Sequence, residues 1–293
     1  SRTLQFIFIK VALDIFKDAK ITMEHSISKG IFGEIHKKDP LTMKEVKLIK
    51  EKMTELINRD VEIKKISVDK EKAIKIFEDY GMEDKVLLLK QMDFSKVSLY
   101  ELEGRYDYFY GNMGYSTGII KAFDVIKYAH GFVLRNPKET DITRLHDFKE
   151  QKRLAAIFYE TKEWLRILGI SEVGSLNNKV LNGNLRDVIL VSEALHEKKI
   201  AEIADQIVNK KDVKVVLIAG PSSSGKTTFA NRLGIQLRVN GLIPIPISLD
   251  DYFLDRENTP KDEDGNYDFE SINSIDLKLF NKHLNELLQG EEV

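Results

Sequence analysis

Residues 42–81, TMKEVKLIKEKMTELINRDVEIKKISVDKEKAIKIFEDYG, decide the fold that we predict for the first part of the chain. Thr42 and Glu45 have the spacing of a capping box, which predicts a helix that begins at this point. The residues expected on its buried face are Val46, Ile49, Met53 and Leu56. A strand is expected over residues 61–68, and Asp69 then begins a second helix. Ala73, Ile76 and Phe77 should face inward from it. This alternation is typical of an α+β domain.

The segments on either side extend the same pattern. Residues 4–16 place apolar side chains at helical spacing and predict an amphipathic helix docked on a core. They are far shorter than the roughly 20 residues of a membrane-spanning helix and do not form a signal peptide. The apolar run of residues 86–89 predicts a strand. Residues 106–118 are rich in Tyr and Gly and predict a loop, which is the first place to look for a binding surface, before regular structure at residues 119–128.

Beyond residue 137 the composition changes. Residues 147–168 predict a helix, residues 174–184 a Gly- and Asn-rich loop, and residues 185–208 two further helical pieces. Three regions are therefore expected: an α+β domain of residues 1–137, a helical connector of residues 138–210, and the first part of an α/β domain with a parallel sheet at residues 211–293.

The overall composition excludes several classes of protein. A hydrophobic content of 42% and a charged content of 31% are those of a globular protein rather than a disordered one. Lys and Arg number 45 against 47 Asp and Glu, so a net charge of -2 gives no strong overall attraction to nucleic acid or to an anionic membrane. The absence of cysteine excludes disulfides and thiolate metal sites and agrees with a cytoplasmic protein.

A phosphate-binding motif follows the apolar run of residues 215–219. The motif is GPSSSGKTT at residues 220–228, and the residues expected to contact a nucleotide are Gly220, Ser222, Ser223, Ser224, Gly225, Lys226, Thr227 and Thr228. In such a loop the backbone amides converge on phosphate, Lys226 reaches the β- and γ-phosphates of ATP, and Thr227 places its hydroxyl on Mg²⁺. The alternative is a Gly- and Ser-rich turn that only joins a strand to a helix.

Carboxylates follow the next expected strand, at residues 243–247, which its two prolines mark as an edge strand. Asp250 would then lie at the carboxyl end of a strand and could accept the proton of a substrate hydroxyl, which makes it and Lys226 the candidate catalytic residues. Asp251 is the alternative carboxylate, and both could instead cap a helix or face solvent. Glu270 and Asp268 could bind substrate hydroxyls or cap the helix expected near residues 276–288.

The run from GPSSSGKTT through SLDDYF to YDFE resembles the uridine kinase and phosphoribulokinase family of P-loop kinases. The resemblance implies ATP- and Mg²⁺-dependent phosphorylation of a nucleoside hydroxyl, most often the 5′-hydroxyl of uridine or cytidine. It assigns the catalytic carboxylate to Asp250 and a ribose contact to Glu270. Tyr252 and Phe253 stand where the family has other residues, so they are candidate substrate contacts and pyrimidine preference is open.

Residues 2–137, above all residues 52–81 and the segment STGIIKAFDVIKYAHG, are similar to the editing-type second domain of threonyl-tRNA synthetase. That family domain carries a His-x-x-x-His pair and a Cys-x-x-x-His pair. The matching residues here are Arg2, Phe6, Phe109 and Met113. These side chains cannot form that metal site, so inherited hydrolysis of mischarged tRNA is not expected. The six histidines, His25, His36, His130, His146, His196 and His283, show no ligand spacing and are expected in ordinary surface or core roles.

The combination of a synthetase-like first region and a kinase-like last region in one chain resembles bacterial TGS-domain uridine kinase-like proteins. Because the chain begins with Ser, we expect the natural N-terminus upstream, where a TGS domain would lie. Residues 213–293 are fewer than the roughly 100–150 of a usual domain, so the remaining strands and an arginine-bearing lid are expected beyond Val293. The chain as given should bind phosphate weakly and transfer it poorly.

Three hypotheses remain open. The first is the nucleoside kinase. The second is a regulatory protein that binds tRNA-like RNA through the editing-like domain and senses a nucleotide at residues 220–228. In the third, the first domain is a scaffold for a homo-oligomer, with the aromatic loop of residues 106–115 at the interface. None of the three hypotheses involves binding to a membrane.

Overall fold

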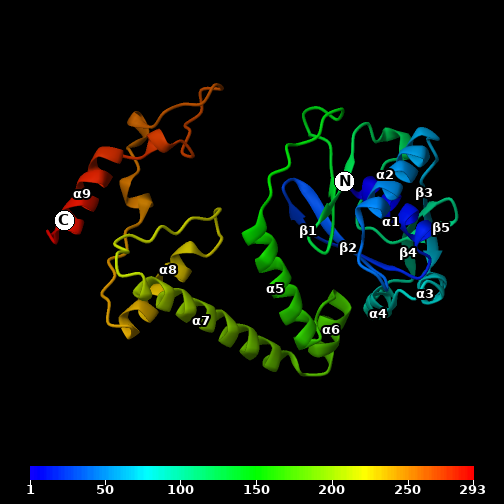
Figure 1. Ribbon diagram of the computed structural model, residues 1–293, viewed down its shortest axis with the longest axis horizontal. Helices are drawn as coiled ribbons and strands as arrows, with labels where there is room; N and C mark the ends of the chain where they lie inside the picture. Colours follow the sequence, from blue (N-terminus) through cyan, green and yellow to red (C-terminus); the bar gives the residue numbers. More distant parts are fainter. The chain divides into compact units, whose positions relative to one another are not determined.

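The computed structural model describes all residues, 1–293, and divides them into two compact units, Ser1–Leu185 and Arg186–Val293 (Figure 1). Each unit has its own apolar core. No helix combines the length and the apolar composition that crossing a membrane would require.

The first unit is an α+β structure, as expected. Its helices are α1 (Arg2–Ile15), α2 (Met43–Asn58), α3 (Lys70–Asp79), α4 (Glu83–Gln91), α5 (Lys152–Leu168) and α6 (Val173–Leu181). Its strands are β1 (Lys20–Ile27), β2 (Gly30–His36), β3 (Lys64–Asp69), β4 (Lys96–Leu102), β5 (Arg105–Asp107), β6 (Asp124–Tyr128) and β7 (Gly131–Arg135). They form two antiparallel sheets, in the orders β1-β2-β7-β6 and β3-β4-β5.

The four-stranded sheet has two different faces because side chains alternate along a strand. One face packs on α1 and α2, where the rings of Phe8 and Phe132 stack at 4.1 Å. Gly33 allows the close approach of strands on this face, since a Cβ there would lie 2.6 Å from the backbone oxygen of Thr22. The other face carries Phe32 and Val133 toward α5.

The three-stranded sheet packs its inner face on α3 and α4. The core between them contains Val68, Ala73, Phe77, Leu89, Val97 and Leu99. On the other face Lys65 and Ser67 of β3 lie opposite Tyr100 and Ser98 of β4, and Tyr100 and Leu102 on this face are buried in the core beside α1 and α2. The exposed part of this face carries Lys65, Ser67, Lys96 and Ser98.

Most helices of this unit agree with the sequence. The capping box of Thr42 and Glu45 is confirmed, and so is the buried face of α2. Asp69 is the N-cap residue of α3, although its side chain makes no capping hydrogen bond. The helix expected at residues 4–16 is α1, and it is buried on nearly all sides rather than on one.

Two segments differ from the sequence prediction. Residues 86–89 belong to α4 rather than to a strand, and residues 174–181 belong to α6 rather than to a loop. The two helices support each other: the side-chain amide of Gln91 donates to Gly174 O at 2.9 Å, and Leu87 lies against Gly174. Helix α4 packs on both α3 and α6, which explains why apolar residues occur on several of its sides.

The second unit consists of helices and irregular segments. A single helix, α7 (Leu185–Asn209), replaces the two expected pieces, and α8 (Lys226–Val239) and α9 (Leu277–Gln289) follow. The core residues shared by α7 and α8 are Ile200, Ala204, Leu233 and Leu237.

The expected parallel sheet is not formed in residues 186–293. Residues 215–219 and 243–247 have no strand hydrogen bonds, and Leu217 and Ile243 are 86% and 87% exposed. The apolar pattern alone indicated strands, but a strand persists only when a neighbour satisfies its backbone and covers its side chains. The two segments do not pair with each other.

We predict that Thr42→Ala lowers the free energy of unfolding of the first unit by about 1 kcal/mol, because it removes the hydroxyl that accepts from the amide of Glu45. Urea unfolding followed by fluorescence of Trp164, the single tryptophan, measures this. Thr54→Ala on the same helix is the control, since its hydroxyl only bonds the carbonyl of Lys50. Equal effects of the two changes would contradict the capping role.

Candidate functional site

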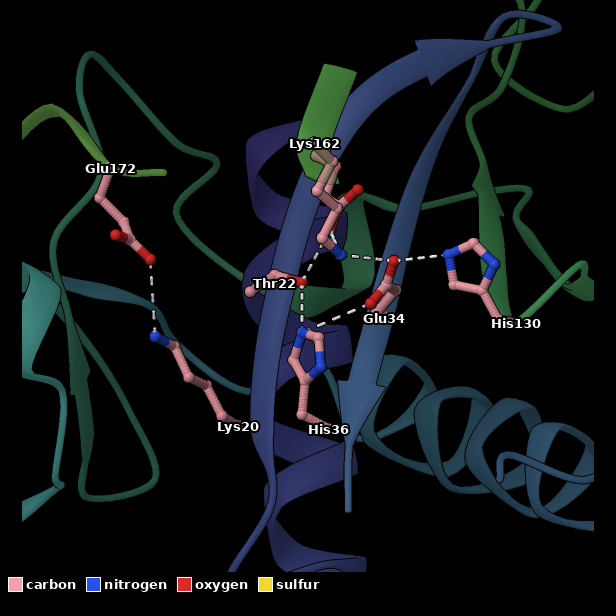
Figure 2. Close-up of polar contacts among 8 residues, drawn as sticks. Lys20, Thr22, Glu34, His36, His130, Lys162 and Glu172 are labelled. Carbon is pink, nitrogen blue, oxygen red and sulfur yellow. Dashed lines mark hydrogen bonds and ion pairs between the residues drawn. The ribbon is translucent and has the colours of Figure 1, made fainter. Parts of the chain in front are cut away.

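A buried carboxylate, Glu34 of β2, is the centre of a polar cluster on the α5 side of the four-stranded sheet (Figure 2). Its side chain is only 10% exposed. Lys162 Nζ of α5 lies 2.6 Å from Glu34 Oε1, and His130 Nε2 donates to the same oxygen at 2.7 Å. A carboxylate in this position is stable only because cationic and N–H donors surround it.

Strand β1 contributes a second carboxylate. Lys162 Nζ also donates to Glu24 Oε1 at 2.6 Å, so one ammonium group joins two carboxylates. The pairing of β1 with β2 is irregular between Met23 and Ser26. This bulge lets two consecutive residues, Glu24 and His25, line the same cavity, which a regular strand would not allow.

His36 completes the cluster at the end of β2. Its Nε2 lies 3.6 Å from Glu34 Oε2 and 3.0 Å from the hydroxyl of Thr22. One ligand atom from each of Glu24, Glu34 and His36 lies within 4.8 Å of the others. Carboxylate oxygens and imidazole nitrogens at this separation are a donor set that a divalent metal ion can use.

The charges of the cluster follow from its surroundings. Burial alone would raise the pKa of Glu34, but the hydrogen bonds and charges of Lys162 and His130 outweigh it and hold this pKa below its usual value. Burial would likewise lower the pKa of Lys162, but the bonds to Glu24 and Glu34 raise it instead. Burial lowers the pKa of His36. At neutral pH the Glu34 carboxylate and the Lys162 ammonium are therefore charged, and His36 is neutral.

An aromatic cavity of about 370 Å³ adjoins the cluster. Its lining includes Glu24, His25, Phe32, Tyr128, His130, Tyr159 and Lys162. The ring of His25 stacks between Phe158, at 3.7 Å, and Phe32, at 5.1 Å, and its buried Nε2 has no hydrogen-bond partner. Burial also lowers the pKa of His25. The cavity could therefore take a small ligand beside the carboxylates.

Sequence analysis did not find this cluster. His36 and His130 lie on different strands, far apart in the sequence, and Lys162 lies in a region interpreted only as a helix. A local signal does exist, because Phe32, Glu34 and His36 alternate along β2 and therefore share a face. What lies opposite that face depends on the packing of α5, which no local pattern indicates.

A second cavity, of about 270 Å³, lies on the outer face of the three-stranded sheet. We call it the lysine–tyrosine groove; it is lined by Lys65, Phe94, Lys96, Val97, Ser98, Tyr108, Phe109, Tyr110 and Gly111. Tyr110 is 84% exposed, and Tyr100 beneath the loop donates to Gly111 O at 2.7 Å. The aromatic loop expected from residues 106–118 is thus held against two lysines of the sheet.

The structure brings together the four residues matched to the ligand positions of the editing-type domain. The rings of Phe6 and Phe109 lie 5.5 Å apart, and Met113 packs against the same core. A Cβ on Gly111 would lie 3.3 Å from the guanidinium of Arg2. These positions are filled by rings, a thioether and a cation, which is not a metal-binding set.

The phosphate-loop residues lie at the start of α8. Gly225 has a φ of +83° and precedes the first helical residue, Lys226. The Lys226 ammonium donates to the carbonyls of Gly220 and Pro221, at 2.9 and 3.0 Å. The loop and the helix therefore form where the sequence predicted them, whereas the strand expected at residues 215–219 is absent.

The remaining predicted site residues lie farther along the second unit. Asp250 is exposed in a 3₁₀ turn, and its amide donates to the Ser248 hydroxyl. Tyr252 contacts α9 through His283, with its hydroxyl 3.1 Å from the ring Nδ1, so its ring is a packing residue. Phe253 forms an isolated bridge with Ile275, and Glu270 is exposed, its amide bonded to Asp268. No hydrogen bond or ion pair joins Asp250 or Glu270 to Lys226.

Comparison with known proteins finds threonine–tRNA ligases. The protein of that name from Geobacter sp. (strain M21) is 28% identical over 151 residues, which are 51% of this chain and 24% of that protein. The one from Acetivibrio thermocellus is 24% identical over 161 residues, 55% of this chain and 25% of its own length. The matched part thus spans about a quarter of these relatives. No family model matches the chain.

These comparisons overturn the kinase prediction. The similar proteins are ligases named for threonine and tRNA, so phosphorylation of a nucleoside hydroxyl by a uridine kinase-like enzyme is wrong for this chain. The structure agrees, because the two strands that would place Lys226 and Asp250 at one sheet edge are not formed. Short motifs of loop and turn residues resembled the kinase family, but they did not establish its activity.

We predict that Glu34→Gln lowers the free energy of unfolding of the first unit by about 2 kcal/mol at pH 7, the scale of hydrogen bonds to a charged group. The folded pKa of Glu34 is lowered, so its ionised form stabilises the fold above the unfolded pKa, and this contribution is lost as the pH falls through the folded value. The difference between wild type and variant should therefore shrink below about pH 4.

Urea unfolding at pH 7 and at pH 3.5, followed by Trp164 fluorescence, measures this difference. Glu139→Gln is the matched control, because Glu139 also bonds a histidine, His146, but is 85% exposed. A Glu34→Gln effect that is the same at both pH values would contradict the assigned charge state.

Proposed function

We propose that the first unit binds tRNA-like RNA through the lysine–tyrosine groove. The similarity of half the chain to threonine–tRNA ligases carries this proposal. The matches of 151 and 161 residues are longer than this range alone, and we infer that they include residues 2–137, where the sequence resembles the editing-type domain of this family.

The chemistry of the groove supports RNA as the ligand. Lys65 and Lys96 supply positive charge for phosphate groups, and neither forms an ion pair with a carboxylate. Tyr108 and Tyr110 present rings beside them, and unpaired bases stack on exposed aromatic side chains. Their arrangement over a sheet face gives both a backbone contact and a base contact within one cavity.

We propose binding without hydrolysis at this place. Phe6, Phe109 and Met113 fill the matched ligand positions with side chains that neither hold a catalytic metal nor move a proton at neutral pH. Arg2 adds a cation next to Gly111 of the groove, where it favours an anionic ligand.

A second element of the proposal is nucleotide binding at residues 220–228, which would let the protein sense a nucleoside triphosphate. The residues fit a phosphate: Phe229 donates the first amide hydrogen bond that closes on Gly225, so the amides of residues 226–228 have no partner inside the helix. Lys226 would leave the carbonyls of Gly220 and Pro221 for the phosphate oxygens. Bound Mg²⁺ would supply charge neutralisation beside the Thr227 hydroxyl.

RNA binding is tested with a fluorescein-labelled, unacylated tRNA transcript and the full chain. We expect binding at 50 mM NaCl that weakens at 200 mM, because phosphate contacts release counterions. Lys65→Gln/Lys96→Gln should raise Kd at least about fivefold and reduce the salt dependence by roughly one to two counterions. Fluorescence anisotropy measures both.

The matched control for charge is Lys44→Gln/Lys47→Gln, two exposed lysines of α2 outside the groove. It should leave Kd within about twofold of wild type if the groove is the RNA site. No binding at 50 mM NaCl, or an equal loss in both double variants, would reject the proposed RNA site.

Nucleotide binding is tested separately, by titrating a fluorescent ATP analogue with and without Mg²⁺. Lys226→Ala should weaken binding by about tenfold or more, since it removes the charge directed at the phosphates. Lys278→Ala on α9 is the control and should bind like wild type. Equal affinity of the Lys226 variant and wild type would show that this loop is only a turn.

A further inference from the structure

The Lys162 ammonium occupies a place where acidic and imidazole groups converge. Its Nζ is 2.6 Å from one oxygen each of Glu24 and Glu34, which belong to neighbouring strands. Figure 2 shows Lys162 directed from α5 into this group, with His36 and His130 on either side of Glu34. The cluster is therefore a site that already binds a cation, supplied by the chain itself.

The donors around this cation suit a metal ion as well as an ammonium group. The ligand atoms of Glu24, Glu34 and His36 lie within 4.8 Å of one another, so small side-chain movements would bring all three onto one ion. Two carboxylates and one imidazole leave a fourth position of a tetrahedral ion open. The cavity of about 370 Å³ beside Glu24 and Lys162 gives that position access to water or a small ligand.

We propose that Glu24, Glu34 and His36 form a zinc-class metal site for which Lys162 competes. Without metal, Lys162 neutralises the carboxylates and attaches α5 to the sheet; with metal, the ion takes its place. This site is independent of the proposed RNA site, because none of its residues line the lysine–tyrosine groove.

Neighbouring groups support these ligand roles. His130 Nε2 bonds Glu34 Oε1 at 2.7 Å and so orients the carboxylate without needing to bind the ion. The Thr22 hydroxyl donates to Glu24 Oε1 at 3.2 Å and so orients the second carboxylate.

Competition between the Lys162 ammonium and the metal ion predicts two opposite effects of Lys162→Met. Loss of the ammonium leaves Glu24 and Glu34 without their main partner, which destabilises the metal-free unit. The same change removes the competitor, so Zn²⁺ should bind at least about tenfold more tightly than to wild type. Saturating Zn²⁺ should also restore the thermal midpoint of the variant, since an ion that binds only the folded state stabilises it.

The experiment is isothermal titration of the full chain with ZnCl₂, combined with thermal melts with and without the metal. Lys152→Met is the matched control, because Lys152 also lines the cavity but pairs with Glu150 at 3.5 Å outside the cluster. It should bind Zn²⁺ like wild type. Adding His36→Ala to Lys162→Met should abolish the tight site.

A second measurement does not depend on the stability of the Lys162 variant. Trp164 lies two residues from Lys162 on α5, so Zn²⁺ should change its fluorescence in wild type as Lys162 leaves the carboxylates, and should not do so in His36→Ala. Unchanged or weaker Zn²⁺ affinity in Lys162→Met, or tight binding that survives His36→Ala, would overturn the proposal.

Discussion

The packing around α1 is the constraint on which the first unit depends. Every residue from Thr3 to Ala12 except Gln5 is buried, so the side chains of this helix contact several neighbours at once. Phe8 stacks on Phe132 of the four-stranded sheet, and Phe6 contacts Phe109 of the aromatic loop. The Thr3 hydroxyl accepts from the amide of Gly114 at 2.9 Å. The position of the lysine–tyrosine groove is therefore fixed by the same helix that fills the core.

The four-stranded sheet separates this apolar core from a polar, ligand-sized region. Along β2, Ile35 faces the core, while Phe32, Glu34 and His36 face α5. The apolar side provides the stability with which the other side can hold a buried carboxylate. Because burial removes water from the Glu34 carboxylate, it needs cations or N–H donors, and Lys162 and His130 supply them. A charged group held this way is sensitive both to pH and to any cation that competes for it.

In the second unit the short phosphate-loop motif predicted local structure correctly but did not predict strand pairing. The loop of residues 220–228 precedes a helix as its glycines and hydroxyl residues predict, because turn and helix-start preferences are local. The strands on either side of the same motif need partners, and residues 186–293 provide none. Phosphate binding needs only the loop and the helix start, whereas a transfer reaction needs Asp250 placed by a sheet.

The sequence by itself determined the helices whose signals are local. The capping box of Thr42, the inward face of α2 and the apolar spacing of residues 4–16 are all present in the structure. Local composition failed at α4 and α6, because Gln91 and Leu87 stabilise α6 through contacts with residues far along the chain. The cluster of Glu24, Glu34, His36 and Lys162 was decided only by tertiary structure. A bulge, the pairing of two strands and the packing of one helix must all occur before these groups meet, and no single stretch of sequence encodes that combination.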